Sequence, residues 1–262
     1  MKLFFRKLGE GQPLVILHGL FGMSDNWLTI GKELSKNYSV FLVDQRNHGQ
    51  SPHSDVFNYK VMSDDLFEFA NEHHLNKAII IGHSMGGKTA MQFSIEHPEK
   101  INKLIVVDIA PKYYSHHHQE IINALLSMDL SKIKSRKEAE EQLSLKIKDE
   151  STKQFLLKNL YWLPCAKASR SAESLGWRFN LETLSKNKDV VGEAINENNH
   201  FDKPTLFVKG EKSDYILDED MSLIKKIFPK AELITIPNSG HWVHADNPKE
   251  FLKDLVNFIE SQ

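Results

Sequence analysis

Five short apolar segments limit the fold more than any other feature of the sequence. They occupy residues 39–43, 78–81, 104–107, 205–209 and 232–236. Strands without an alternating polar face are typical of parallel sheets that helices cover on both sides. Helical patterns separate or follow these segments, at residues 24–37, 59–74, 86–97, 217–228 and 248–260. This alternation predicts an α/β fold with a mostly parallel, doubly wound sheet flanked by helices.

Two other regions have patterns of their own. Residues 3–8 and 13–17 flank the sequence Gly9-Glu10-Gly11, which predicts a hairpin at the start of the chain. Residues 112–200 contain no convincing buried strand, but Ala139, Leu143 and Ile147 recur every four residues, as on one face of a helix. We therefore expect a core of residues 1–111 and 201–262 that carries a helical cap of residues 112–200.

Composition excludes several classes of protein. The 262 residues include 33 Lys+Arg and 35 Asp+Glu, for a net charge of −2, which argues against a chain-wide basic surface for nucleic acid. A single cysteine, Cys165, cannot form an intramolecular disulfide. No apolar run approaches the roughly 18 residues that span a bilayer, and the first seven residues do not resemble a signal peptide. We expect a cytoplasmic protein without a membrane partner, and the sequence leaves monomer and homodimer open.

The sequence Gly82-His83-Ser84-Met85-Gly86 fits the pattern G-x-S-x-G. The pattern alone is weak, but here a buried strand precedes it and a helical pattern follows it, as a nucleophile elbow requires. Such a sharp turn would project the Ser84 hydroxyl above the sheet, and the amide of Met85 could donate to an oxyanion. We interpret His83 as the variable residue of the elbow and not as a second base.

Polar and glycine-rich sequences also follow the other predicted strands. They are the loop that begins with His18 and Gly19, then Asp108, then Ser213 and Asp214, and finally His241. Carboxyl ends of parallel strands lie at one edge of a sheet, where ligands bind. A serine needs a base within hydrogen-bond reach, and His241 is the best candidate. The triplet 116–118 of histidines suggests a metal site, but it lacks partners at ligand spacing, so we expect a solvated surface and no metal.

Taken together, these motifs resemble the serine hydrolases of the α/β-hydrolase family. The segments 18–22 (HGLFG), 44–51 (DQRNHGQS), 82–86 and 239–242 (SGHW) occur in the order of that family. The segments RNHG and VDIAP are similar to those of a narrower group, the small bacterial esterases of the YbfF type and related mitochondrial hydrolase-domain proteins. The resemblance implies a catalytic triad, no cofactor, an oxyanion loop that contains His18 and Gly19, and the backbone amide of Leu20 as the second oxyanion donor.

The acid of the triad has two candidates. In many relatives it follows the penultimate strand in the pattern G-x-x-D, where this chain has Ser213, with Asp214 one residue later. Asp108 ends a buried strand, where an ionised carboxylate is costly unless it is paired. The narrower group resembles enzymes whose acid follows the strand after the elbow. We therefore choose Asp108, with Ser213 as an auxiliary hydrogen-bonding group and Asp214 as the alternative acid.

The resemblance predicts a serine esterase that hydrolyses small-molecule carboxylic esters or thioesters, including acyl-coenzyme A, through an acyl-enzyme. Four aromatic residues of the cap are candidates for the walls of the acyl site: Tyr161, Trp162, Trp177 and Phe179. Each of them could equally well be buried in the hydrophobic core of the cap itself. Other serine enzymes of this family remain open, namely carbon–carbon bond hydrolases, lactonases and perhydrolases. A ligand receptor with a vestigial triad is the alternative from a different class.

Overall fold

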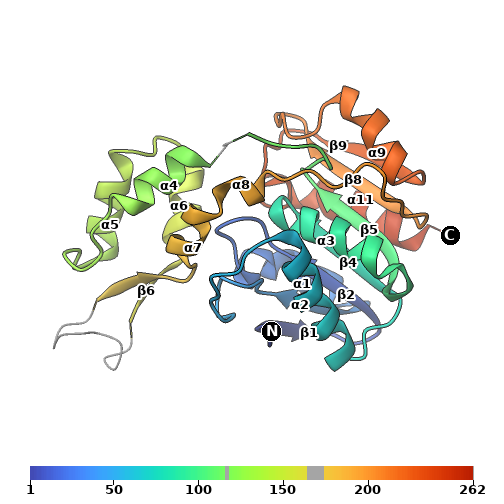
Figure 1. Ribbon diagram of the computed structural model, residues 1–262, viewed down its shortest axis with the longest axis horizontal. Helices are drawn as coiled ribbons and strands as arrows, with labels where there is room; N and C mark the ends of the chain where they lie inside the picture. Colours follow the sequence, from blue (N-terminus) through green and yellow to red (C-terminus); the bar gives the residue numbers. More distant parts are fainter. Residues whose placement is uncertain (116–117, 164–173, 262) are drawn as a thin grey trace.

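A seven-stranded sheet with helices on both faces forms the larger part of the computed structural model, which describes residues 1–115, 118–163 and 174–261 (Figure 1). Its strands are β1 (Phe5–Leu8), β2 (Gln12–Leu17), β3 (Tyr38–Val43), β4 (Ala78–His83), β5 (Ile101–Val107), β8 (Thr205–Gly210) and β9 (Ala231–Ile236). The order across the sheet is β1-β3-β2-β4-β5-β8-β9, and only β1 runs antiparallel to its neighbour. The predicted α/β fold is confirmed. Cys165 lies outside the described residues.

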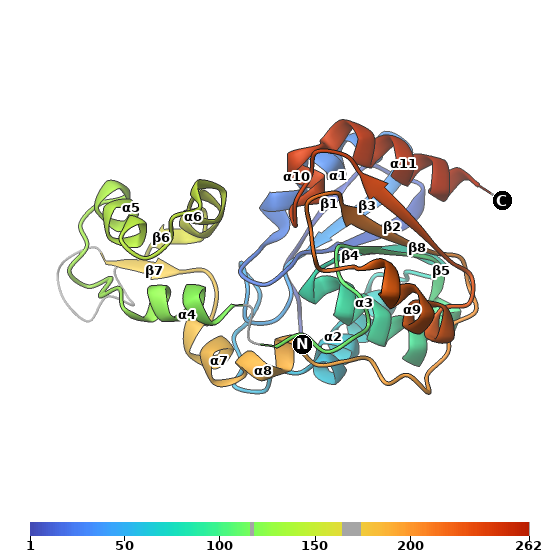
Figure 2. The same cartoon turned by 90° about the horizontal axis from the view of Figure 1, so that it is seen from above.

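Helices cover the two faces of the sheet (Figure 2). One face carries α1 (Leu28–Leu34), α10 (Val243–Asp246) and α11 (Pro248–Glu260), and the other carries α2 (Tyr59–Glu72), α3 (Met85–Glu96) and α9 (Met221–Ile227). Short 3₁₀ turns lie at Ser24–Trp27, Pro98–Lys100 and Asp218–Asp220. Leu14 and Ile16 of β2 belong to the first core, whereas Val15 and Leu17 belong to the second. The central strands β3 and β4 are buried along their whole length, which explains why both are mostly apolar.

The predicted hairpin at the start of the chain is wrong. Strand β1 pairs with β3, and β3 lies between β1 and β2. All six residues of β3 are buried, so this strand needs a neighbour on each side. Gly9 has φ +68°, and a Cβ there would lie 2.2 Å from the carbonyl oxygen of Ser35, so the turn packs against the chain that leads into β3.

The strand order reverses between β2 and β4, and this reversal determines where the site forms. The chain passes from β2 outward to β3 and then returns to β4 on the other side of β2. In register, Leu17 lies beside Gly82, His83 beside Val107, and Val107 beside Val208. The loops that follow these strands therefore begin at the same level of the sheet. A reversal of this kind is the usual ligand site of an open α/β sheet.

The elements between β5 and β8 form a separate layer beyond the carboxyl edge of the sheet (Figures 1 and 2). They are α4 (Gln119–Leu126), α5 (Arg136–Ser144), α6 (Glu150–Leu157), β6 (Leu160–Trp162), β7 (Leu175–Trp177), α7 (Leu181–Lys186) and α8 (Lys188–Val191). Ala139, Leu143 and Ile147 are buried there, as their spacing predicts. The antiparallel pair of β6 and β7 was not expected, because strands of three residues leave no recognisable pattern.

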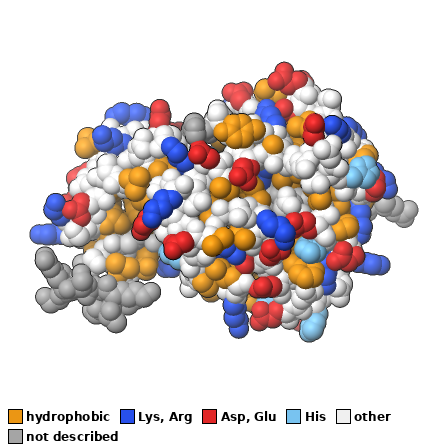
Figure 3. Space-filling model, in the orientation of Figure 1, with side chains coloured by type: hydrophobic (Ala, Val, Ile, Leu, Met, Phe, Trp, Pro, Cys, Tyr) orange, Lys and Arg blue, Asp and Glu red, His pale blue; other side chains and the backbone are white. Residues whose placement is uncertain are grey.

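Two further observations concern the charge of the surface and the hydropathy of the helices. Charged side chains of both signs are interspersed over the face in Figure 3. No helix among the described residues is both long and apolar enough to cross a bilayer.

Candidate active site

Ser84 lies on a sharp turn between β4, which ends at His83, and α3, which begins at Met85. Its backbone has φ 52° and ψ −118°, a conformation that residues with a side chain rarely adopt. The turn is held because the Ser84 amide donates to the Val107 carbonyl (2.9 Å) and the Lys88 amide donates to the Ser84 carbonyl (3.1 Å). The strained residue is therefore fixed from both sides.

Glycines make this turn possible by leaving out a Cβ. A Cβ at Gly82 would lie 2.3 Å from the carbonyl oxygen of Gly86. A Cβ at Gly86 would lie 2.5 Å from the carbonyl oxygens of both Leu17 and His18. The first contact closes the elbow on itself, and the second brings the start of α3 against the end of β2. Both glycines of the G-x-S-x-G pattern thus have a steric reason.

His241 follows β9, and its ring is oriented by the buried carboxylate of Asp108 at the end of β5. His241 Nδ1 donates to Asp108 Oδ2 (2.7 Å), and the amide of Gly210 donates to Asp108 Oδ1 (3.0 Å). The hydroxyl of Ser213 also donates to Asp108 Oδ2. Asp108 is completely buried, so these three donors replace the water that its carboxylate has lost.

Asp214, the alternative acid, lies elsewhere. It is exposed, and within the described part of the chain its carboxylate has no hydrogen bond or ion pair. The geometry thus brings Asp108 and Ser213 to His241 and leaves Asp214 in solvent.

Ser84 and His241 line the same cavity. In the described residues no hydrogen bond joins the Ser84 hydroxyl to the His241 ring. Contacts between a nucleophile and its base are often long without substrate and shorten when the substrate binds. The arrangement is therefore compatible with proton transfer once a substrate occupies the cavity.

A tight turn follows β2 and approaches Ser84. The Gly22 amide donates to the Gly19 carbonyl (2.9 Å), and Phe21 has φ 59°. A Cβ at Gly19 would lie 2.8 Å from His83 Nδ1 and 3.2 Å from the Cβ of Ser84, so a larger residue there would push against the elbow. Among the described residues, no acceptor is found for the backbone amides of Leu20 and Met85.

His18 fixes this turn through a defined tautomer. The amide of Gln45 donates to His18 Nε2 (3.0 Å), so that nitrogen carries no proton. The proton is on Nδ1, which donates to the Gly19 carbonyl (2.8 Å). Burial lowers the pKa of His18 to about 4, which keeps the ring neutral and this pair of bonds intact near pH 7.

Two supporting contacts of His241 were not predicted from the sequence. The Tyr215 ring stacks on the His241 ring, with 4.0 Å between centroids and 19° between planes. His83 Nε2 donates to the backbone carbonyl of His241 (2.8 Å), so His83 holds the loop of the candidate base. Burial, together with His241 and His244, keeps the pKa of His83 well below its usual value, which agrees with a residue that is not a base. Neither contact leaves a signal in the sequence, because each joins distant segments.

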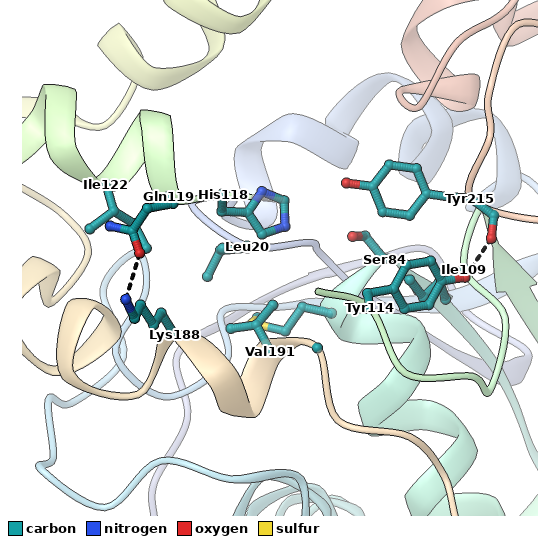
Figure 4. A pocket seen from close by; sticks show the side chains of 12 residues that line it. Leu20, Ser84, Ile109, Tyr114, His118, Gln119, Ile122, Lys188, Val191 and Tyr215 are labelled. Carbon is teal, nitrogen blue, oxygen red and sulfur yellow. Dashed lines mark hydrogen bonds between the residues drawn. The ribbon is translucent and has the colours of Figure 1, made fainter. Parts of the chain in front are cut away.

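Two cavities meet at Ser84, and both also include Leu20 and His118 in their walls. One cavity lies beside the segments that join residues 112–200 to the core, and we call it the hinge-side cavity; its walls include Met85, Ile109, Tyr114, Ile122, Val191 and Gly192 (Figure 4). The base-side cavity has walls that include Phe21, Ile121, Phe155, Leu156, His241 and Trp242. Both are mostly apolar. In Figure 4, Lys188 and Gln119 are hydrogen-bonded to each other (2.7 Å) at the end of the hinge-side cavity away from Ser84.

The structure decides between the two places that the sequence left open for the aromatic residues of residues 112–200. Tyr161, Trp162, Trp177 and Phe179 are not among the described residues that line either cavity. Trp177 stacks on the buried Phe179 with 5.3 Å between ring centroids, so these two belong to the packing of the cap.

His118 also differs from its prediction. Residues 116 and 117 lie outside the described residues, but His118 is half-buried and lines both cavities instead of a solvated surface.

Comparisons with known proteins also find similarity to hydrolases. The model of the family described as alpha/beta hydrolase fold matches residues 12–248. The chain is 37% identical over 261 residues to the sn-1-specific diacylglycerol lipase ABHD11 of Danio rerio, and this alignment covers 96% of this chain and 80% of that protein. It is 34% identical over 253 residues to esterase YbfF of Escherichia coli (strain K12), and this alignment covers 95% of this chain and 94% of that protein. A solved structure of a marine microorganism esterase superposes with a TM-score of 0.92 at 47% identity, over 98% of this chain and 99% of that one.

Proposed function

Because this chain belongs to the α/β-hydrolase family, we propose that it is a serine esterase in which Ser84, His241 and Asp108 form the catalytic triad. The observation that carries the proposal is the hydrogen bond between His241 Nδ1 and the buried Asp108 carboxylate (2.7 Å), in a histidine that lines the same cavity as Ser84. The relatives named as lipase and esterase support the cleavage of carboxylic esters.

The reaction follows from these positions. His241 Nε2 takes the proton of the Ser84 hydroxyl as its oxygen attacks the ester carbonyl carbon. The Asp108 carboxylate stabilises the imidazolium and keeps the ring in its orientation. The amides of Leu20 and Met85, which have no acceptor in the described structure, donate to the oxyanion. His241 then gives its proton to the leaving alcohol, and water cleaves the acyl-enzyme by the same steps in reverse.

The two cavities divide the substrate between them. The leaving group must lie beside His241, which protonates it, so the alcohol part belongs in the base-side cavity. The acyl part then extends into the hinge-side cavity, whose walls of Met85, Ile109 and Val191 favour an apolar chain. We propose that residues 112–200 act as a cap that closes both. A thioester would react by the same acyl transfer, so acyl-coenzyme A is the second substrate class to measure.

Ser84→Ala tests the nucleophile. This variant should lose ester hydrolysis and labelling by a fluorophosphonate probe while its melting temperature changes little, since only one oxygen atom is removed. Ser239→Ala is a matched control, because Ser239 is also buried, lies in the loop before His241, and uses its hydroxyl only to bond the Ile236 carbonyl (2.7 Å). The control should keep both activities.

Labelling that persists in Ser84→Ala would refute the assignment. Many turnovers on a short p-nitrophenyl ester would distinguish an enzyme from a ligand receptor, which should release product about once per molecule.

A further inference from the structure

Lys88 is a buried lysine that the proposed reaction does not use. It lies on α3 one turn after Ser84, and its side chain is completely buried. Among the described residues its ammonium forms no ion pair with a carboxylate. It donates instead to two backbone carbonyls, those of Lys112 (2.6 Å) and Glu193 (2.7 Å), and lies 5.3 Å from the centre of the Tyr114 ring. Burying an ammonium is costly unless such partners are present.

The two carbonyls belong to the two ends of the cap. Lys112 lies where the chain leaves the core after β5, and Glu193 lies where it returns after α8. These two segments bond to each other, because the Tyr114 amide donates to the Gly192 carbonyl (2.8 Å) and the Ile195 amide donates to the Pro111 carbonyl (2.8 Å). We call this pair of segments, residues 111–114 and 192–195, the hinge pair. Lys88 thus hydrogen-bonds both segments of the hinge pair to α3, the helix that begins beside Ser84.

The hinge pair also forms one wall of the hinge-side cavity. Tyr114 and Gly192 both line that cavity together with Ser84. The two segments fit tightly, since a Cβ at Gly192 would lie 2.0 Å from the Tyr114 carbonyl oxygen. A shift of either segment relative to α3 therefore changes the space beside the nucleophile.

We propose that Lys88 is a positioning residue that fixes the hinge pair to the nucleophile helix and thereby sets how well longer acyl chains bind. It acts through the carbonyls of Lys112 and Glu193 and does not line either cavity. The inference rests on the proposed esterase function and on the acyl chain lying in the hinge-side cavity.

A lysine suits this position better than an apolar side chain of similar length. One ammonium group supplies three donors and reaches carbonyls 24 and 105 residues away along the chain. Burial lowers the pKa of Lys88 to about 7, while the Glu193 carboxylate raises it and the Lys112 ammonium lowers it. The Lys112 ammonium is itself paired with Asp220 (2.6 Å). A methionine would fill the same space but would leave both carbonyls without their donor.

Lys88→Met tests this role, with Lys103→Met as the matched control. Lys103 is also buried and donates to backbone carbonyls, those of Phe258 and Ile259 (2.9 and 3.0 Å), but these lie at the end of α11. We expect Lys88→Met to lower the ratio of kcat/KM for p-nitrophenyl octanoate to that for p-nitrophenyl acetate by about tenfold, because the carbonyls of Lys112 and Glu193 both lose their donor and the cavity wall is no longer fixed to α3. Most of the change should be a higher KM for the octanoate.

The control should lose stability and keep that ratio. An unchanged ratio in Lys88→Met, or an equal change in both variants, would overturn the proposal. Lys88→Gln keeps two N–H donors and should restore part of the selectivity, which a purely structural role would not predict.

Amide hydrogen exchange of the unmodified protein tests the same contact without any variant. If Lys88 holds the hinge pair, the amides of Tyr114 and Ile195 should exchange within about tenfold of the slow amides of β4, although they lie outside the sheet. Exchange as fast as in exposed loops would overturn the proposal even if the variants do not fold. If the protein hydrolyses neither ester, the proposed function fails, while the exchange experiment still reports on the hinge pair.

Discussion

At the scale of single residues, the site depends on how one buried carboxylate is hydrogen-bonded without water. Asp108 has φ 53° and no exposed surface, and its oxygens accept from His241, Gly210 and Ser213. These donors come from two loops that follow different strands, so the carboxylate joins the loops after β5, β8 and β9. An amide side chain of the same shape would offer an N–H group where the His241 Nδ1–H points, which favours the imidazole tautomer with its proton on Nε2.

Asp108→Asn should therefore lower kcat by about 10⁴, since the ring would be held in the wrong tautomer. Asp214→Asn should change kcat by less than about threefold, because the exposed Asp214 carboxylate has no partner in the described residues. Steady-state kinetics on a short ester, with circular dichroism to verify folding, would measure both. A collapse of activity in the Asp214 variant alone would make Asp214 the acid.

At the scale of elements, the sequence predicts the strands well and their neighbours less well. The five apolar segments became β3, β4, β5, β8 and β9. In β3, β4, β5 and β8 nearly every residue is buried, which leaves a recognisable apolar composition, whereas the edge strand β9 exposes Glu232 and Thr235. The position of β3 between β1 and β2 was missed, since pairing depends on which strands need two neighbours and not on closeness along the chain. The cap strands β6 and β7 were missed because they are too short.

The same difference between local patterns and distant pairing explains which residues of the site could be predicted. Ser84, Asp108 and His241 were recognisable because each follows a strand and has a reactive side chain. The support of His83 for the His241 loop and the stacking of Tyr215 on His241 were not, since both depend on which loops meet at the sheet edge. Lys88 was not singled out for a similar reason: its partners are backbone carbonyls, and any residue type can supply them.

The contact between the elbow and β2 gives a prediction at this scale. Gly86→Ala would place a Cβ 2.5 Å from two carbonyl oxygens at the end of β2, and these cannot move without shifting the turn that carries Leu20. We expect kcat/KM to fall by about 10² or more, the usual cost of a misplaced oxyanion donor.

Gly240→Ala is the control for this variant. Its Cβ would lie 3.5 Å from Asp246 Oδ2, an ordinary contact, although it is adjacent to His241. It should retain kcat/KM within about threefold. Comparable losses in the two variants would show that the close approach of α3 to β2 is not what the reaction needs.

At the scale of the whole molecule, buried histidines gather around the site and couple its stability to pH. His18, His48, His83 and His244 are each at most 6% exposed. Burial lowers the pKa of His18 to about 4, and lowers those of His48 and His244 to about 3. In the unfolded chain a histidine titrates near 6.5, so between that pH and the lowered value the unfolded chain binds more protons than the folded chain. The stability that these neutral histidines contribute is complete above about pH 6.5 and is lost as the pH falls toward 4 for His18 and toward 3 for His48 and His244.

His244→Phe isolates one part of this effect. The His244 ring stacks on Trp27 with 3.8 Å between centroids and 13° between planes, and its Nδ1 is buried without a partner in the described structure. Phenylalanine keeps an aromatic ring on Trp27 and removes both the titration and the unsatisfied nitrogen, so the free energy of unfolding at pH 8 should stay the same or rise. Between pH 6.5 and 4.5 the unmodified protein should lose about 2 kcal/mol more than the variant, because the slope of 1.36 kcal/mol per pH unit is reached only below the pKa of the unfolded histidine. Urea unfolding at pH 8, 6.5 and 4.5 would measure the difference, and parallel curves for the two proteins would mean that His244 is protonated as easily in the folded state as in the unfolded one.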